Sequence, residues 1–170
     1  MKCNLNFLQQ NNISYYWNTL FIGLKLDLIN SSQIANYAMQ YLAEHHTETN
    51  QFIVELASIK DTTFSVDKLL EHLIENCTPG TSEWNKEERK LRFCLLLDLQ
   101  KNILDAELLL EKIAEVYAKF DYPPDMEEFI YYMSAKNYDP SQYSITDNRQ
   151  RLLILFNAFL HKEKNDISFR

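Results

Sequence analysis

The stretch Leu91-Arg92-Phe93-Cys94-Leu95-Leu96-Leu97-Asp98-Leu99 decides the fold that we expect for this chain. Five consecutive apolar residues, Phe93 to Leu97, cover every direction around a helix axis, and a helix that is apolar on all sides is buried. The run is too short to span a bilayer, which needs ~20 apolar residues. We therefore predict that residues 84–104 form the central helix of a soluble helical domain.

Amphipathic helices are expected on either side of this segment, because apolar residues recur there at helical spacing. One such stripe consists of Trp17, Leu20, Phe21 and Leu24, and Ser14 is the expected N-cap of its helix. Gly23 lies inside this stripe at a cost of ~1 kcal/mol against alanine, so we expect a neighbouring helix to approach closely there. Similar stripes predict helices over residues 5–8, 34–42, 52–59, 66–74, 108–117, 126–133 and 152–160, with Ser65, Pro124 and Thr146 at three of their starts.

The fold class that follows is all-α: an irregular bundle of about eight or nine helices, with solenoid-like stacking as a variant. No segment of useful length alternates with period two, and short turns between helices place neighbours antiparallel. A chain of 170 residues is long enough for one domain, which we expect to span residues 1–170. Residues 134–145 are expected to form an irregular loop, and residues 162–170 a frayed tail.

Composition excludes several functions. The chain has two glycines, Gly23 and Gly80, with which no phosphate-binding loop or dinucleotide fingerprint can be written. With 24 acidic and 17 basic side chains, the net charge of −7 disfavours nucleic acid and membranes and favours a basic protein partner. No apolar signal region follows Met1, so we expect a cytoplasmic location.

The strongest charge feature lies between Asp105 and Glu128, where eight acids face two lysines. Three of the acids, Glu107, Glu111 and Glu115, are spaced i, i+4, i+8, so they share one helix face. Like charges at this spacing destabilise a helix by ~0.2–0.5 kcal/mol per pair. Two interpretations stay open: an ordinary solvated face, or a column of acids that meets a basic partner.

Tyrosines accompany these acids. Tyrosine combined with carboxylates is typical of protein-binding surfaces, because the ring supplies contact area and the hydroxyl a polar tip. Tyr117 and one of Tyr131 or Tyr132 can instead pack in the core. Adjacent residues lie ~100° apart on a helix, so we expect one of Tyr131 and Tyr132 at the surface.

No catalytic motif, metal site or cofactor site is expected. The chain has no nucleophile elbow, and Cys94 lies in the most apolar run, where a thiol is inert. The three cysteines lack CxxC spacing, so they give little support to a zinc site. His45 and His46 are adjacent and diverge on a helix, and His72 has no HExxH companion. A metal-dependent hydrolase that uses these histidines is therefore kept only as an alternative.

Several segments together resemble a family of small bacterial all-helical proteins whose domain has no assigned function. The most distinctive is Ile113-Ala114-Glu115-Val116-Tyr117-Ala118-Lys119-Phe120-Asp121-Tyr122-Pro123, and residues 17–24, 55–58, 66–70, 129–133 and 139–140 also fit. The similarity spans roughly residues 5–160 and carries no catalytic motif. Some members lie beside contact-dependent or polymorphic toxins, so the resemblance implies the helical fold and an immunity role.

Our functional hypothesis is a cytoplasmic, non-enzymatic immunity protein that binds and neutralises a cognate toxin domain, a basic nuclease. An acidic, tyrosine-bearing face would occupy the nucleic-acid site of such a toxin. The expected partner-binding residues are Glu111, Glu115, Asp121, Tyr122, Asp125, Glu128 and Tyr132. A generic protein-interaction adaptor is an alternative that differs only in its partner.

Overall fold

A computed structural model describes residues 1–48, 50–59, 66–75 and 77–168, and within these ranges it confirms the all-α prediction. The described residues form eight α-helices and two short 3-10 helices, and they contain no strand. None of the helices described is long and apolar enough to cross a membrane. The expected turn at 60–63 and the expected cap Ser65 lie outside the described residues.

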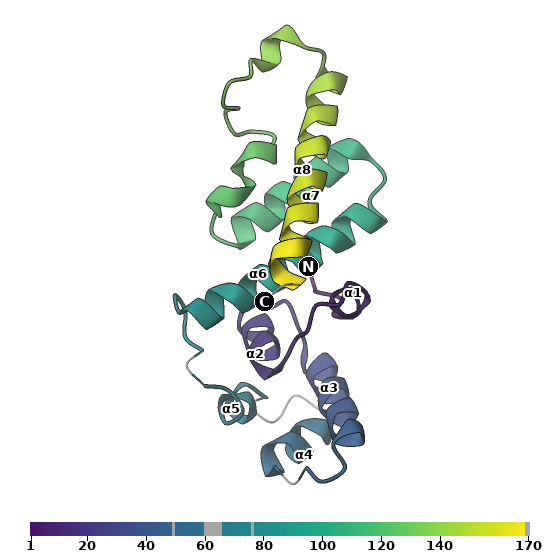
Figure 1. Ribbon diagram of the computed structural model, residues 1–170, viewed down its shortest axis with the longest axis vertical. Coiled ribbons are helices and arrows are strands. Elements are labelled where there is room, and N and C mark those ends of the chain that lie inside the picture. Colours follow the sequence, from purple (N-terminus) through teal and green to yellow (C-terminus); the bar gives the residue numbers. More distant parts are fainter. Residues whose placement is uncertain (49, 60–65, 76, 169–170) are drawn as a thin grey trace. The chain divides into compact units, whose positions relative to one another are not determined.

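The chain forms two compact units, and each is described by itself (Figure 1). Unit 1 consists of Met1–Cys3 and Ser14–Leu91, and unit 2 of Asn4–Ile13 and Arg92–Arg170. The boundary near Leu91 falls inside the predicted central helix, which the structure has as α6 (Ser82–Asn102). The expectation of a single domain stays a prediction.

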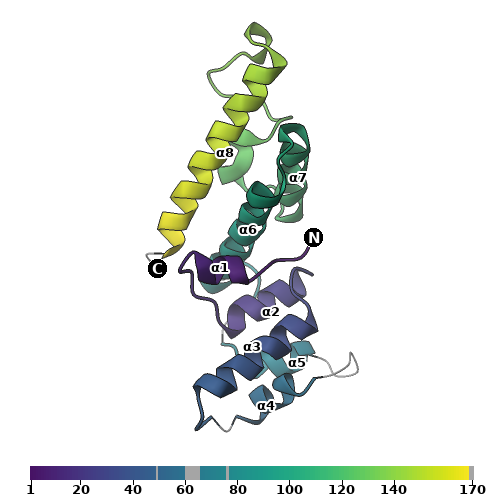
Figure 2. The same cartoon turned by 90° about the vertical axis from the view of Figure 1, so that its right-hand side faces the viewer.

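Unit 1 holds four helices besides the first half of α6. They are α2 (Trp17–Lys25), α3 (Ser31–Glu44), α4 (Gln51–Ala57) and α5 (Val66–Glu71). Helix α4 packs on both α3 and α5, and α5 also packs on α2 (Figure 2). Fully buried aliphatic side chains form the core of this unit: Leu20, Ile22, Leu28, Ile34, Leu56 and Leu70.

Both tryptophans belong to unit 1. The indole of Trp17 packs edge-on against the rings of Tyr37 and Tyr41, with centroids 4.8 and 5.4 Å apart. Trp84, in the first turn of α6, is buried. Apolar and aromatic contacts thus anchor the starts of both α2 and α6.

The start of α2 corrects one expectation. The helix begins after Tyr16 rather than after Ser14, and the Tyr16 amide donates to the hydroxyl of Thr19 at 3.1 Å.

The backbone at Gly23 is crowded, as expected, but the crowding does not come from a neighbouring helix. A Cβ at this position would lie 2.7 Å from Cγ1 of Ile29, in the segment after α2, and nearer still to its Cδ1. The glycine lets this segment fold back onto its own helix.

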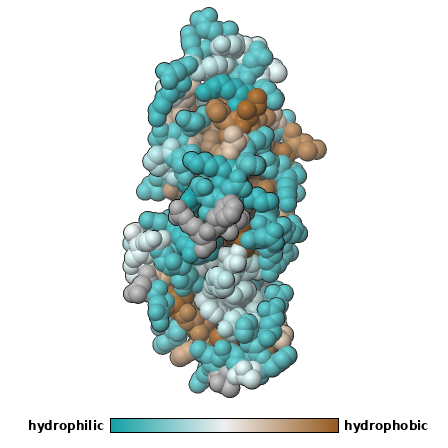
Figure 3. Space-filling model, in the orientation of Figure 1, coloured by the Kyte–Doolittle hydropathy of each residue, from teal (hydrophilic) through white to brown (hydrophobic). Residues whose placement is uncertain are grey.

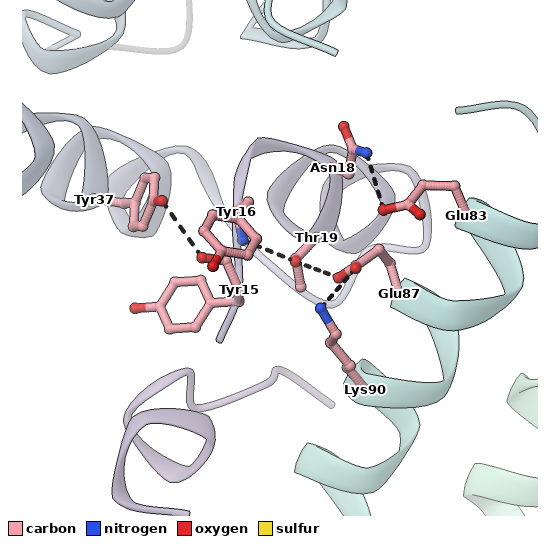
Figure 4. A network of polar contacts seen from close by, with 8 residues as sticks. All are labelled: Tyr15, Tyr16, Asn18, Thr19, Tyr37, Glu83, Glu87 and Lys90. Carbon is pink, nitrogen blue, oxygen red and sulfur yellow. Dashed lines mark hydrogen bonds and ion pairs between the residues drawn. The ribbon is translucent and has the colours of Figure 1, made fainter. Parts of the chain in front are cut away.

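A buried polar network joins α2 to α6 within unit 1 (Figure 4). The Thr19 hydroxyl donates to Oε2 of Glu87 at 2.5 Å, and Nζ of Lys90 lies 2.7 Å from Oε1 of the same carboxylate. All three side chains are buried. At the rim, the Asn18 amide donates to Glu83 at 3.3 Å. A buried charge is tolerated when it is paired and hydrogen-bonded, and here each one is.

Unit 2 is built from the second half of α6 and the C-terminal helices. It contains α1 (Asn6–Gln10), α7 (Ala106–Lys119), the 3-10 helices η1 (Pro124–Phe129) and η2 (Pro140–Gln142), and α8 (Ile145–Ser168). Helix α8 packs on η1 and α7. All five residues of the run Phe93 to Leu97 are buried, as predicted.

The C-terminal region differs from the prediction in three places. The helix expected over 126–133 is the shorter 3-10 helix η1, which ends at Phe129. Helix α8 begins at Ile145, and Ser144 rather than Thr146 caps it by accepting from the Asp147 amide at 3.1 Å. Residues 162–168, expected to be frayed, are the last turns of α8. They are ordered because Glu163 and Ile167 continue the buried face of Leu160 at i+3 and i+7.

Candidate partner-binding site

A cavity of about 330 Å³ lies in unit 2 among α7, η1, the segment after η1 and the first half of α8. Its apolar wall includes Leu110, Ile130, Met133, Ile145 and Leu152. In Figure 3, brown apolar atoms gather over this upper region, between the segment after η1 and α8. Its volume is at the small end of the range for ligand pockets, ~300–1,000 Å³.

Helix α7 carries two of the acids that line the cavity. It starts at the N-cap Asp105, whose carboxylate accepts from the Leu108 amide at 2.8 Å. Glu107 and Glu111 lie one turn apart on the same face, and both line the cavity. Glu115, the third acid of the predicted column, is exposed and pairs with Lys112 at 2.6 Å. The column therefore divides into a cavity part and a solvated part.

Helix α8 brings two arginines to the opposite wall. The Arg149 guanidinium forms an ion pair with Glu107 at 2.6 Å, and that of Arg151 lies 4.2 Å from the ring centroid of Tyr138. Glu111 and Glu128 are exposed, and neither forms an ion pair with any residue that the structure describes. The cavity thus offers two carboxylates without a cationic partner in the described chain.

The segment between η1 and α8 is tied to α8 by hydrogen bonds with Asn148. The Tyr138 hydroxyl donates to Asn148 at 2.6 Å, and the Asn148 amide donates to the carbonyl of Pro140 at 2.9 Å. The Tyr138 ring stacks on Tyr143 with centroids 4.9 Å apart. Burial is the main cause that raises the pKa of Tyr138, and the nearby Tyr143 hydroxyl raises it further. These contacts hold the outer wall of the cavity in place before any partner binds.

Asp139 fixes the turn at η2. Its carboxylate accepts from the hydroxyl of Ser141 at 2.7 Å and from the amide of the same residue at 3.0 Å. These hydrogen bonds, together with one from Gln142, lower the pKa of Asp139. The Asp139-Pro140 turn therefore supports the neighbouring Tyr138.

A cluster of tyrosines lies beside the cavity. Tyr117 is buried, and Tyr122 and Tyr132 pack against its ring with centroids 5.3 and 6.5 Å apart. We expected one of Tyr131 and Tyr132 at the surface, and the structure exposes both, at 54% and 52%. Tyr131 lines the cavity, whereas Tyr132 does not. Tyr131 was not among the expected binding residues.

The seven expected binding residues are only partly brought together. Glu111 and Glu128 line the cavity, and Tyr122 and Tyr132 lie beside Tyr117. Glu115 and Asp121 are exposed but do not line the cavity. Asp125 has a structural contact, because its carboxylate accepts from both terminal nitrogens of the buried Arg92, at 2.9 and 2.5 Å.

Sequence reasoning missed the residues that the far side of the cavity contributes: Tyr131, Tyr138, Arg149 and Arg151. The signal for α8 was present, because Ile145, Asn148, Arg149 and Leu152 recur at helical spacing and form one face. This face could be recognised from the sequence alone. The residues of α7 on the opposite wall lie about forty residues earlier in the chain, so no local pattern links the two walls.

The histidines of the alternative hydrolase lie in separate ring contacts. The His45 ring stacks on Tyr41 and the His72 ring on Phe52, both with centroids 4.1 Å apart. Among residues 1–48, 50–59, 66–75 and 77–168, no three His, Cys, Asp or Glu side chains are grouped so that they could hold a metal ion.

The fold and the cavity together define an all-helical protein with a pre-formed, acid-rimmed pocket. Residues 5–164 match the family described as uncharacterized protein conserved in bacteria (DUF2247), and the chain belongs to this family. The resemblance to a bacterial family without an assigned function is thereby confirmed. Neither a curated protein nor a solved structure shows significant similarity to the chain.

Proposed function

We propose that this protein is a bacterial immunity protein that binds and neutralises a toxin domain, a basic nuclease, through the cavity face of unit 2. The observation that carries the proposal is the pair Glu111 and Glu128, two exposed carboxylates at one cavity without an ion-pair partner in the described chain. Under this proposal the protein is a cytoplasmic binding module that performs no catalysis and needs no cofactor.

Charge supports a nuclease as the target. A surface that holds RNA or DNA is basic, because it must neutralise phosphates. Carboxylates placed at such a surface occupy the phosphate positions, and complementary charge speeds association and selects the partner. The net charge of −7 extends this attraction beyond the cavity itself.

Exposed apolar and aromatic area supports a protein partner. Around the cavity, Tyr131, Met133 and Ile145 are 54%, 37% and 71% exposed. Tyrosine and methionine are enriched in interface centres, where they supply contact area that acids alone do not provide. A charged rim around apolar side chains is the usual anatomy of a binding face.

The test is co-expression with the toxin domain encoded beside this protein, followed by native mass spectrometry and a nuclease assay. We expect a 1:1 complex without nuclease activity. The double variant Glu111→Lys/Glu128→Lys should weaken the complex. The matched control is Glu44→Lys/Glu75→Lys, which changes the net charge equally at two exposed acids of unit 1.

Three results would contradict parts of the proposal. Absence of a complex would reject the immunity role. A complex that keeps nuclease activity would favour the adaptor hypothesis. Equal weakening by the two double variants would leave general charge attraction as the cause and remove the cavity from the binding face.

A further inference from the structure

We infer that the cavity of unit 2 receives an arginine side chain of the protein partner. The inference rests on the proposed function for the identity of that partner, and it specifies what the partner must present. Three features of the cavity carry it: the balance of its charges, the chemistry of its walls and the hydrogen bonds of its outer segment.

The cavity is lined by three glutamates and two arginines, so its charge balance favours a cation. The Arg149 charge is balanced by Glu107 at 2.6 Å, and the Arg151 guanidinium is held over the Tyr138 ring at 4.2 Å. Glu111 comes from α7 and Glu128 from η1, so two carboxylates from different elements line the same space. An incoming guanidinium can donate to both, because it presents five N–H donors in a planar fork.

The walls fit the rest of an arginine side chain. Its aliphatic stem would contact Leu110, Ile130 and Leu152, which line the cavity as apolar surface. The exposed ring of Tyr131 lies at the same cavity and offers a face on which a guanidinium stacks. A wholly apolar ligand would leave the carboxylates unpaired, and an anion would be repelled by them.

The outer wall is held on α8 by hydrogen bonds. The hydrogen bonds Tyr138–Asn148 and Asn148–Pro140, at 2.6 and 2.9 Å, fix the segment that closes the cavity. Binding then costs little ordering of the protein, which preserves affinity for a ligand as small as one side chain.

The test uses N-acetyl-arginine methylamide as the probe and its neutral isostere N-acetyl-citrulline methylamide as the control, titrated into the methyl-labelled full chain. We expect the arginine probe to shift the methyl signals of Ile130, Met133, Ile145 and Leu152, with a Kd of about 1–10 mM. Citrulline should bind at least about tenfold more weakly, because it keeps the shape but loses the charge.

A double variant tests the two carboxylates. Glu111→Gln/Glu128→Gln should weaken arginine binding about tenfold, whereas Glu44→Gln/Glu75→Gln should leave it unchanged. The methyl signals of unit 1, such as those of Ile34, report in the same spectra that each variant is folded. Equal binding of arginine and citrulline, or unshifted cavity methyl signals, would overturn the inference.

Failure of this inference and failure of the immunity role are distinguishable. Arginine binding at the cavity without toxin neutralisation would keep the site and reject the immunity role. Toxin neutralisation by the unaltered protein, together with no arginine binding to that protein, would keep the immunity role and reject the site.

Discussion

Units 1 and 2 both contain close ion pairs, but they place them in different surroundings. In unit 1, Lys90 and Glu87 are 2.7 Å apart and both side chains are buried. At the cavity of unit 2, Arg149 and Glu107 are 2.6 Å apart, with 39% and 62% of their side chains exposed. The distances are nearly equal, so the difference in role comes from solvent. Buried charges serve packing, whereas exposed ones stay available to a partner.

The largest effect is expected for Lys90→Met, because it leaves the Glu87 carboxylate buried without its cation. Breaking a buried ion pair typically costs about 3–5 kcal/mol, and urea denaturation should show a loss of that size in the free energy of unfolding. The double variant Lys90→Met/Glu87→Leu should be more stable than Lys90→Met alone. A loss below about 1 kcal/mol for Lys90→Met would mean that this pair behaves like a surface pair.

Packing density offers a second contrast between the units. Gly23→Ala should destabilise the protein by about 1–3 kcal/mol, because the new methyl group overlaps Ile29. Ile29→Val removes the Cδ1 atom nearest to that methyl, so the double variant Gly23→Ala/Ile29→Val should recover part of the lost stability, as measured by thermal unfolding.

In unit 2, the Ala135→Met side chain enters the open cavity. This variant should change stability by less than about 1 kcal/mol while blocking the arginine probe. A large loss for Ala135→Met would mean that the cavity has no spare room.

A pH dependence is expected from Tyr37 in unit 1. Burial is the main cause that raises its pKa to about 12 from the ordinary tyrosine value of about 10, and the neighbouring Tyr15 adds to the shift. Above pH ~10 the unfolded chain loses this proton first, so stability is full below pH 10 and falls as pH rises to about 12. The fall should be smaller in Tyr37→Phe when unfolding is followed between these pH values. An identical fall in both proteins would assign it to other groups.

The smallest effect is expected for Glu107→Gln, which removes an exposed ion pair at the cavity. Such pairs contribute about 0–1 kcal/mol, so the free energy of unfolding should hardly change. Compared with Lys90→Met, this variant shows how far exposure to solvent reduces the cost of breaking an ion pair of nearly the same length. A loss above about 2 kcal/mol would show that Arg149 and Glu107 hold α8 on α7.

Local patterns predicted most of the helices, because a stripe of apolar residues at helical spacing needs only its own segment to be recognised. The buried run Phe93 to Leu97 and the stripe from Trp17 to Leu24 are confirmed for that reason. Helix ends were less predictable. At the start of α8, two hydroxyls lie within three residues. Ser144 is the cap because Asp147, three residues on, accepts from its amide and its hydroxyl, whereas Arg149 follows Thr146 at that spacing.

The candidate site was predictable on one side only. Glu111 stood out because its neighbours along the same helix are also acids. The contact between Arg92 and Asp125 joins residues 33 positions apart, and no local pattern distinguishes Asp125 from the other acids around it. Arg151 and Tyr138 likewise acquire their roles from the way the segment after η1 returns along α8.

The placement of the two indoles has a spectroscopic consequence. Trp17 and Trp84 are the only tryptophans of the chain, and both belong to unit 1, whereas tyrosines occur in both units. Indole emission therefore follows the unfolding of unit 1, while far-ultraviolet circular dichroism follows all helices. Coincident transitions would mean that the chain unfolds as one cooperative body. Separate transitions would show that each unit has its own stability. The comparison of the two signals needs neither a label nor a truncated chain.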